Sequence, residues 1–254
     1  MEIDFGKTAK DYGQYRAGFP DAFFDRIVRE GFVQSCHRLL DLGTGTGTVA
    51  RGFALRGCHV TGLDPSSALM AEAKQLDAAA GVTVQYIEAK AEATGLPDAS
   101  FDLVSAGQCW HWFDRARAAA EVRRVLKPGG RLIICHFDWI PQSGNVAQLT
   151  EALIEAHNPH WKLGGGKGIY PRWLSDMGDA GFQDIETFSF DIDAIYSHAA
   201  WRGRIRASAG VAASLPPDAV ARFDAELQAL LSEEFPEDPL RVLHRVWAAT
   251  AVSP

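Results

Sequence analysis

The chain has 254 residues and a formal net charge of −7, and 47% of its residues are hydrophobic. This length and apolar content fit one elaborated globular domain, and no apolar run is long enough to span a membrane. The acidic balance argues against a nucleic-acid substrate, and the scattered cysteines predict neither a disulfide framework nor a metal site.

Residues 1–35 precede the first predicted strand. The opening residues are acidic and lack the basic-then-apolar layout of a signal peptide, which predicts a cytoplasmic protein. A helix is predicted from Asp21 onward, because Phe23, Phe24, Ile27 and Val28 fall on one side at helical spacing.

The most informative segment is Leu39–Gly47, which reads LLDLGTGTG. A short apolar run ends in Asp41 and breaks into a glycine-rich turn, and Thr48–Arg56 then has helical spacing. Glycines let a backbone approach a ligand that a Cβ would exclude. The start of a helix offers unpaired N–H groups to polar atoms. A strand–turn–helix nucleoside site is therefore predicted.

Two kinds of ligand fit this turn: a dinucleotide, and a nucleoside that carries an ammonium group. Gly45, Gly47 and Ala50 match a dinucleotide fingerprint, with Asp64 as the acid at the end of the next strand. Asp41 argues against that interpretation, because its charge would repel a pyrophosphate and attract an ammonium group.

The following elements alternate between strands and helices. Ser66 and Asp114 are predicted helix caps, and Pro128 with two glycines is predicted to end the second helix. The predicted strands are His59–Asp64, Val82–Ile87, Phe101–Ser105 and Arg131–His136, with a turn at Val125–Gly130.

The last third of the chain is less regular. Prolines and a triple glycine argue against a long regular element between His136 and Pro171. Beyond it the pattern predicts a strand over Gly181–Phe190, helices over Trp201–Ala212 and Pro217–Phe235, and a final strand over Leu240–Val252.

In their order these segments resemble the class I S-adenosylmethionine-dependent methyltransferases, within the methyltransferase type 11-like group that acts on small molecules. The resemblance covers roughly the first 140 residues and Ala180–Phe182. It implies an α/β, Rossmann-like, doubly wound seven-stranded sheet whose last strand is antiparallel. The expected single domain, 1–254, comprises an N-terminal lid segment (1–35), a cofactor-binding core (36–140), substrate-lid insertions (141–171 and 195–236) and the last strands (180–192 and 239–252).

The resemblance also assigns the cofactor residues. Asp41 would help to hold the methionine amino group of S-adenosylmethionine, and Asp64 would accept hydrogen bonds from both ribose hydroxyls. Many relatives carry an acid where this chain has Lys90, so the backbone of Ala91 is the preferred adenine contact. The full predicted set is Tyr15, Arg16, Asp41, Gly43, Thr44, Gly45, Asp64, Pro65, Ser66, Ala91, Glu92 and Gln108. For Tyr15 and Arg16, an ordinary packed N-terminal segment is an equal alternative.

Imidazole and aromatic side chains follow the fourth and fifth strands, at the edge where ligands of open parallel sheets gather. His111 is the first candidate general base and His136 the second, since histidine titrates near neutral pH. Packing or helix capping by His111 is the alternative. The candidate substrate-binding residues are Trp110, Trp139, Tyr170 and Arg206, although Arg206 also fits a solvated helix face.

The predicted function is methyl transfer to an oxygen or nitrogen of a small-molecule metabolite, in which holding acceptor and methyl group together supplies most of the acceleration. Two alternatives remain at this level: a non-catalytic protein that binds the cofactor, and an NAD(P)-dependent oxidoreductase. The residues indicate neither the acceptor nor the oligomeric state.

Overall fold

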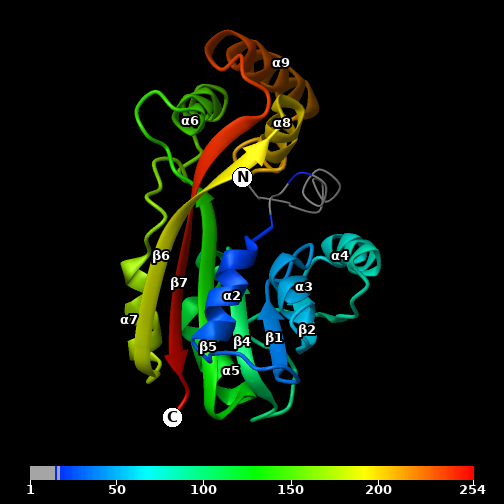
Figure 1. Ribbon diagram of the computed structural model, residues 1–254, viewed down its shortest axis with the longest axis vertical. Coiled ribbons are helices and arrows are strands. Elements are labelled where there is room, and N and C mark those ends of the chain that lie inside the picture. The colour runs from blue at the N-terminus through cyan, green and yellow to red at the C-terminus, as the bar shows by residue number, and fades with distance from the viewer. Residues whose placement is uncertain (1–14, 16–17) are drawn as a thin grey trace. The chain divides into compact units, whose positions relative to one another are not determined.

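The computed structural model describes Tyr15 and residues 18–254 (Figure 1). The helices are α2 (Asp21–Arg29), α3 (Thr48–Ala54), α4 (Ser67–Ala80), the 3-10 helix η2 (Trp110–Trp112), α5 (Arg115–Val125), α6 (Val146–His157), α7 (Pro171–Asp179), α8 (His198–Arg206) and α9 (Pro217–Glu234). The strands are β1 (Arg38–Leu42), β2 (His59–Asp64), β3 (Gln85–Glu88), β4 (Phe101–Gly107), β5 (Leu126–Trp139), β6 (Gln183–Tyr196) and β7 (Leu240–Val252).

The strands form one sheet in the order β3-β2-β1-β4-β5-β7-β6. The pairs among β1 to β5 are parallel, and Asp41 in β1 lies opposite Gly62 in β2 and Ser105 in β4. The chain order reverses at β1, where an open α/β sheet places its ligands. The predicted seven-stranded sheet is confirmed.

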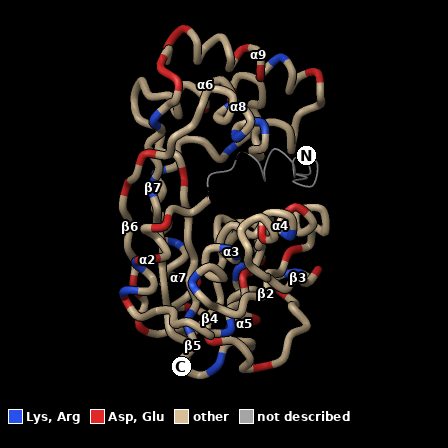
Figure 2. The backbone as a smooth tube through the Cα atoms, turned by 45° about the vertical axis from the view of Figure 1, so that its right-hand side comes forward, with Lys and Arg blue, Asp and Glu red and all other residues tan. Residues whose placement is uncertain are grey.

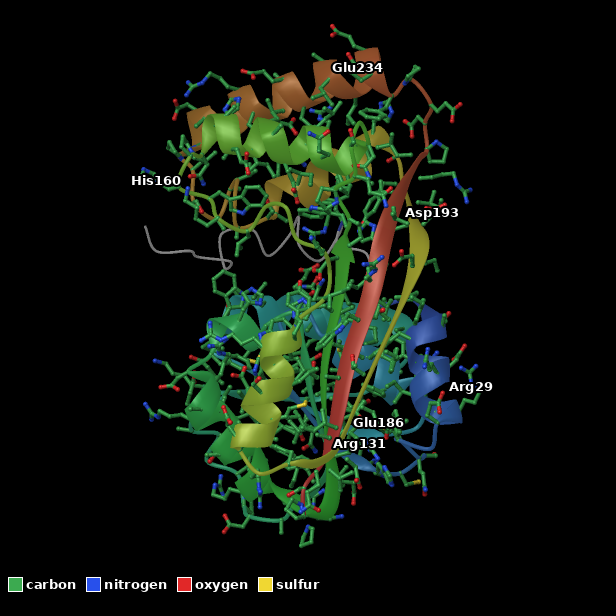
Figure 3. The ribbon with its side chains drawn as sticks, turned by 90° about the vertical axis from the view of Figure 1, so that its left-hand side faces the viewer. Arg29, Arg131, His160, Glu186, Asp193 and Glu234 are labelled. Atoms are coloured by element: carbon green, nitrogen blue, oxygen red, sulfur yellow. The ribbon has the colours of Figure 1, made fainter. Side chains whose placement is uncertain are left out.

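The last strand runs antiparallel to its neighbours. The Gly129 amide donates to the Ser253 carbonyl at 2.8 Å, and the Ser253 amide donates to the Gly130 carbonyl at 2.8 Å. Arg131 in β5 donates to the Thr250 hydroxyl at 2.6 Å and lies 3.7 Å from the Glu186 carboxylate of β6 (Figure 3). One arginine thus links three strands and supports the predicted antiparallel end of the sheet.

Two compact units divide the chain. The sheet unit contains residues 18–137, 169–190 and 246–254. In it, α2 and α3 cover one face of the strands, and α5 packs with α7 on the other (Figures 1 and 3). Its core combines aliphatic strand residues with the large side chains Trp110, Trp173 and Trp247. This core holds the ends of β1, β2 and β4 in place.

The helical unit contains Tyr15 with residues 138–168 and 191–245. Helix α9 packs against α6 and α8, and Trp201, Phe223 and Leu227 are fully buried among them. The two predicted lid insertions supply most of this unit. Their assignment as a substrate lid stays a prediction.

Helix α6 corrects the expectation that 136–171 lacks a long regular element. The Asn145 side chain accepts a hydrogen bond from the Gln148 amide at 2.9 Å and caps the helix. Val146, Thr150 and Ile154 are buried at four-residue spacing. The prolines that argued against a helix flank it, so they bound the helix without breaking it.

Several element boundaries also differ from the prediction. Val125 of the predicted turn ends α5, and residues 126–130 lie inside β5, where Phe101 pairs with Leu126 and Leu103 pairs with Arg131. Helix α8 begins at His198 because the Ser197 side chain caps it, and β6 continues beyond Phe190 to Tyr196. In the part of the chain that the structure describes, none of the helices combines the length and apolar character needed to cross a membrane.

Candidate active site

The glycine turn after β1 adopts a backbone that ordinary residues rarely adopt. Gly43, Gly45 and Gly47 have φ values of +58°, +55° and +76°. A Cβ at Gly47 would lie 2.6 Å from the Tyr86 hydroxyl, and one at Gly43 would lie 2.8 Å from the Cys109 Cβ. Glycine is therefore required by conformation and by close approach at both positions.

Asp41 lies at the end of β1 and is almost completely buried, with 1% of its surface exposed. Its carboxylate accepts hydrogen bonds from the Thr44 and Ser105 hydroxyls, both at 2.7 Å. Burial raises its pKa from 3.8 to about 6, and these hydrogen bonds only partly oppose that effect. The Ala50 backbone amide also donates to this carboxylate, which leaves about one of its four lone pairs for a ligand.

Asp64 ends the neighbouring strand β2 and is also buried. Its two carboxylate oxygens accept from the Gly45 amide at 2.9 Å and from the Ser66 amide at 2.8 Å. Burial raises its pKa. The Ser66 side chain caps α4 as predicted, and Pro65 between them is exposed. Asp64 thus fixes the glycine turn relative to the start of α4.

A connected set of polar side chains packs against the glycine turn, and sequence reasoning missed all three of them: Arg51, Asp77 and Tyr86. The Tyr86 hydroxyl donates to Asp77 at 2.7 Å, and Asp77 pairs with the Arg51 guanidinium at 2.9 Å. Arg51 also donates to the Thr46 carbonyl at 2.7 Å. These contacts join α3, α4 and β3, so no periodicity within a single element could have revealed them.

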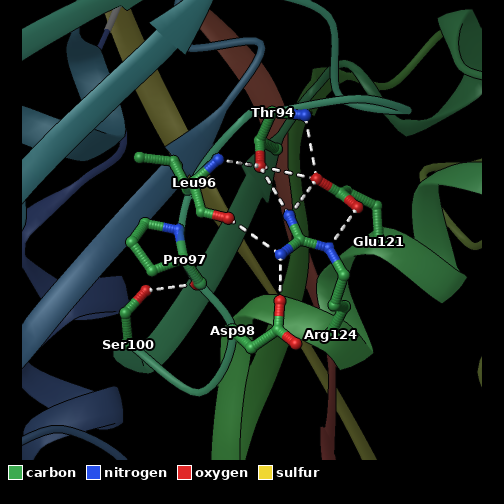
Figure 4. Close-up of polar contacts among 7 residues, drawn as sticks. All are labelled: Thr94, Leu96, Pro97, Asp98, Ser100, Glu121 and Arg124. Atoms are coloured by element: carbon green, nitrogen blue, oxygen red, sulfur yellow. Dashed lines mark hydrogen bonds and ion pairs between the residues drawn. The ribbon is translucent and has the colours of Figure 1, made fainter.

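The loop after β3, predicted to border the adenine, is pinned by Arg124 of α5 (Figure 4). Arg124 donates to the Leu96 carbonyl at 2.8 Å and pairs with Glu121 at 2.7 Å, and Glu121 accepts from the Thr94 hydroxyl at 2.6 Å. Arg124 holds the pKa of Glu121 down at about 2. Ala91 in the same loop is buried. Its polar atoms are all in the backbone, so a polar contact with adenine would come from the backbone.

Glu92 and Gln108 are committed to contacts within the protein. A Glu92 carboxylate oxygen accepts from the Asp114 amide at 2.8 Å. Gln108 has φ +58°, its backbone amide donates to the Cys135 carbonyl at 2.8 Å, and its side-chain amide donates to the Phe137 carbonyl. Gln108 thus shapes the backbone that follows β4.

The structure brings His111, His136 and Tyr170 together in one aromatic cluster. The His111 ring is exposed, and its centroid lies 5.8 Å from that of His136. His136 is buried, with the Tyr170 and Trp173 rings at 4.3 and 4.5 Å. Of the two histidines, His111 is the one exposed to solvent.

Trp110 was predicted to bind substrate, but its side chain does not have the exposed position that a pocket wall requires. Its side chain is fully buried in the core of the sheet unit, and its indole nitrogen donates to Asp176 of α7 at 3.0 Å. It offers a ligand no surface in this conformation. The apolar character that suggested a pocket serves to anchor α7.

The remaining predicted residues belong to the helical unit. The Trp139 indole nitrogen donates to Glu151 at 2.7 Å, and Arg206 pairs with Asp224 at 2.7 Å. Tyr15 is half-buried, and its ring occupies the space that a Cβ at Gly203 would need, 2.2 Å away. Arg16 lies outside the described residues.

These residues fit an adenosyl sulfonium better than a dinucleotide. A buried carboxylate at the end of β1, with a pKa of about 6, favours a cationic partner such as an ammonium group. A pyrophosphate in the same turn would face the charges of both Asp41 and Asp64. In the described part of the chain, no cluster of histidine, cysteine or acidic side chains suits a metal ion.

Comparisons with known proteins agree with this geometry. Residues 40–134 match the methyltransferase domain family. An uncharacterized methyltransferase of Mycobacterium tuberculosis strain H37Rv is 38% identical over 159 residues, which are 63% of this chain and 62% of the relative. A malonyl-acyl-carrier-protein O-methyltransferase of Enterobacter lignolyticus is 36% identical over 132 residues, 50% of this chain and 49% of the relative. The chain thus spans less than two thirds of these curated relatives.

A solved structure shows the same fold. Phosphoethanolamine N-methyltransferase 2 of Haemonchus contortus, in complex with S-adenosyl-L-methionine, has a TM-score of 0.57 and 20% identity, and the match covers 98% of this chain and 56% of that one. Residues 40–134 therefore carry a methyltransferase domain, as the motifs predicted, and the chain has the fold of this solved structure.

Proposed function

We propose that this protein transfers a methyl group from S-adenosylmethionine to an oxygen or nitrogen atom of a small-molecule metabolite. The observation that carries the proposal is the pair of buried acids, Asp41 and Asp64, at the ends of adjacent strands around the glycine turn. One relative is named for O-methylation of a malonyl-acyl-carrier protein, and one structural neighbour for N-methylation of phosphoethanolamine.

Each acid has a distinct role in this proposal. Asp41 receives the ammonium group of the methionine part, which compensates the charge that burial disfavours. Asp64 receives the ribose hydroxyls through the lone pairs that the Gly45 and Ser66 amides leave. The backbone of Ala91 and the Gly43–Gly45 turn contact the adenosine. When bound, the cofactor supplies an electrophilic methyl group on a sulfonium.

His111 is proposed as the general base for an acceptor that must lose a proton. It follows β4 directly, at the edge where the cofactor residues also lie, and its ring is exposed. His136 sits behind it in the aromatic cluster. For an acceptor that is already deprotonated, positioning alone suffices, and His111 then has no proton to take.

A small acceptor fits the charge distribution. Lysine and arginine are interspersed with acidic residues along the tube (Figure 2), and the net charge is −7. A nucleic-acid substrate would need a basic surface to neutralise phosphates. A cytoplasmic location, which suits a metabolite acceptor, remains part of the proposal.

The direct test incubates the protein with isotopically labelled S-adenosylmethionine and a fractionated metabolite pool, with mass detection of labelled products. The proposal expects a labelled small molecule whose formation needs the intact protein. An Asp64→Ala variant serves as the matched control, because it retains the acceptor residues and lacks the ribose contact. Label appearing only in nucleic acid, or in no fraction although cofactor binds, would contradict the proposal.

A further inference from the structure

A tight turn follows β3 at the edge of the sheet where the proposed cofactor residues lie. Glu88, the last residue of β3, pairs with Asp64, so the chain leaves the sheet beside the proposed ribose contact. The Ala93 amide then donates to the Lys90 carbonyl at 3.1 Å and closes the turn, with Ala91 at its tip. An adenosine whose ribose binds Asp64 would bring its base to this turn.

The polar groups that the turn offers a base are mainly those of its backbone. Lys90 has no hydrogen-bond acceptor, and Ala91 has no polar side-chain atom. Glu92 gives a carboxylate oxygen to the Asp114 amide at 2.8 Å. A backbone amide can donate to the N1 atom of adenine, and a backbone carbonyl can accept from its amino group. Hypoxanthine has the opposite pattern, with a donor at N1 and an acceptor oxygen beside it, so such contacts distinguish the two bases.

The turn is held by β3 at its start and by α5 at its end. Glu92 is bound by the amide of Asp114, the residue that caps α5. Thr94 follows the turn, and its amide and hydroxyl both donate to one carboxylate oxygen of Glu121, at 2.9 and 2.6 Å (Figure 4). Glu121 belongs to the same helix. The position of the turn at the sheet edge therefore depends on α5.

Arg124 makes this second attachment rigid. Its guanidinium donates to both carboxylate oxygens of Glu121, at 2.8 and 2.7 Å, and to the Leu96 carbonyl at 2.8 Å (Figure 4). It also donates to Asp98 and to the Thr94 hydroxyl. Groups from the loop and from the helix thus converge on one guanidinium, whose planar fork a lysine ammonium cannot reproduce.

We propose that Arg124 is a positioning residue that sets the selectivity of the cofactor site for adenine over other bases. Arg124 does not contact the base. It fixes residues 94–98 against α5, and this orders the backbone at the tip of the Lys90–Ala93 turn before the cofactor binds. A turn that is already ordered costs less binding free energy than one that must become ordered on binding. The inference rests on the proposed function, in which S-adenosylmethionine binds with its ribose at Asp64.

The test is calorimetric titration of the full chain with S-adenosylhomocysteine and with S-inosylhomocysteine, which carries hypoxanthine in place of adenine. The parent chain should bind the adenine compound about tenfold or more tightly. Arg124→Gln should weaken S-adenosylhomocysteine binding about five- to tenfold and change S-inosylhomocysteine binding by less than about twofold, so the preference for adenine is largely lost. Arg124→Lys keeps the charge without the fork and should give an intermediate preference.

Arg123→Gln is the matched control. Arg123 neighbours Arg124 in α5, but its guanidinium donates to the Ala180 and Gly181 carbonyls, at 3.0 and 2.8 Å, after the end of α7. Arg123→Gln should therefore leave both affinities within about twofold of the parent.

Hydrogen exchange without cofactor gives a second readout. The Thr94 amide donates to Glu121, and the Leu96 amide donates to the Thr94 hydroxyl at 3.2 Å. Both amides should exchange faster in Arg124→Gln than in the parent, while the amides of β1 and β4 keep their protection. In Arg123→Gln the two loop amides should exchange as in the parent.

The inference is overturned if Arg124→Gln keeps the parent's preference for adenine, or if it weakens both compounds equally, which would indicate a general loss of structure. It is also overturned if the parent chain shows no preference, or if the two loop amides exchange at the parent rate in Arg124→Gln. A parent chain that binds no S-adenosylhomocysteine would contradict the proposed function and this inference together. Tight S-adenosylhomocysteine binding with an unchanged preference in Arg124→Gln would contradict this inference alone.

Discussion

Replacing Asp41 with asparagine is expected to stabilise the protein while weakening its cofactor binding. The Asp41 carboxylate is buried, and its pKa is raised from 3.8 to about 6. An acid whose pKa is higher in the folded state binds more protons when folded, so stability falls as pH rises between the two values. Above about pH 6 the carboxylate is ionised in both states, and the whole loss in the free energy of unfolding that comes from its raised pKa is then present.

The size of the effect follows from this rise in pKa. The change from 3.8 to about 6 corresponds to about 3 kcal/mol at pH 7.5 and to about half of that at pH 5. An asparagine side chain at this position would keep one carbonyl oxygen as an acceptor, and the Thr44 and Ser105 hydroxyls can rotate to suit an amide. Because the amide replaces these hydrogen bonds imperfectly, Asp41→Asn should raise the free energy of unfolding by about 1–3 kcal/mol at pH 7.5.

Thermal unfolding of both chains without cofactor, at pH 7.5 and pH 5, measures this gain. Asp77→Asn is the matched control, because Asp77 is also buried but pairs with Arg51 at 2.9 Å and accepts from Tyr86. Asp77→Asn should lower the free energy of unfolding by about 3–5 kcal/mol, since it leaves the buried Arg51 guanidinium without its charge partner.

Calorimetry with S-adenosylhomocysteine completes the comparison. Asp41→Asn should bind this compound about tenfold or more weakly, because the neutral amide no longer attracts the ammonium group. The reasoning is refuted if Asp41→Asn unfolds at a lower temperature than the parent at pH 7.5. It is also refuted if the stability gain is the same at pH 5 as at pH 7.5.

Three other predictions test the site. In thermal unfolding, Gly47→Ala should lower stability more than Gly81→Ala does. Both glycines have positive φ, which costs about 1–2 kcal/mol for alanine, but only the Cβ at 47 would meet Tyr86, and nothing lies within 4 Å of a Cβ at 81. Equal losses of stability would remove the close-approach argument. Affinity for S-adenosylhomocysteine should fall below about pH 6 as Asp41 takes up a proton, whereas a flat profile from pH 7.5 to 5 would exclude Asp41 as the ammonium partner. His111→Ala should lower turnover while cofactor affinity stays within about twofold; unchanged turnover would remove His111 as the base.

The sequence predicted the features that depend on residues close together in the chain. The acids Asp41 and Asp64, the cap at Ser66 and the cap at Asp114 each depend on their position at the end of a strand or start of a helix. Local backbone chemistry determines such features. The sheet order followed from the resemblance, because the motifs occur in the family's order.

Other features depend on contacts between distant segments, and the sequence did not reveal them. Tyr86 lies under Gly47 because β3 pairs with β2, which no spacing within β3 indicates. Trp110 was predicted to bind substrate from its position after the fourth strand, but its indole nitrogen donates to Asp176, 66 positions away.

The same limit applied to the arginines of α8. Arg206 was a candidate substrate-binding residue, but the packing of α9 against α8 pairs it, and Arg202 as well, with Asp224. Whether an arginine of α8 can meet a ligand therefore depends on partners from other elements.

The account rests on an adenosyl sulfonium bound at the turn between Asp41 and Asp64, and parallel calorimetric titrations with S-adenosylhomocysteine and with NADPH test it most directly. The account predicts tight binding of the former, no measurable binding of the latter, and a loss of about 1–3 kcal/mol in cofactor affinity for Asp64→Ala. Tight binding of NADPH alone would contradict it.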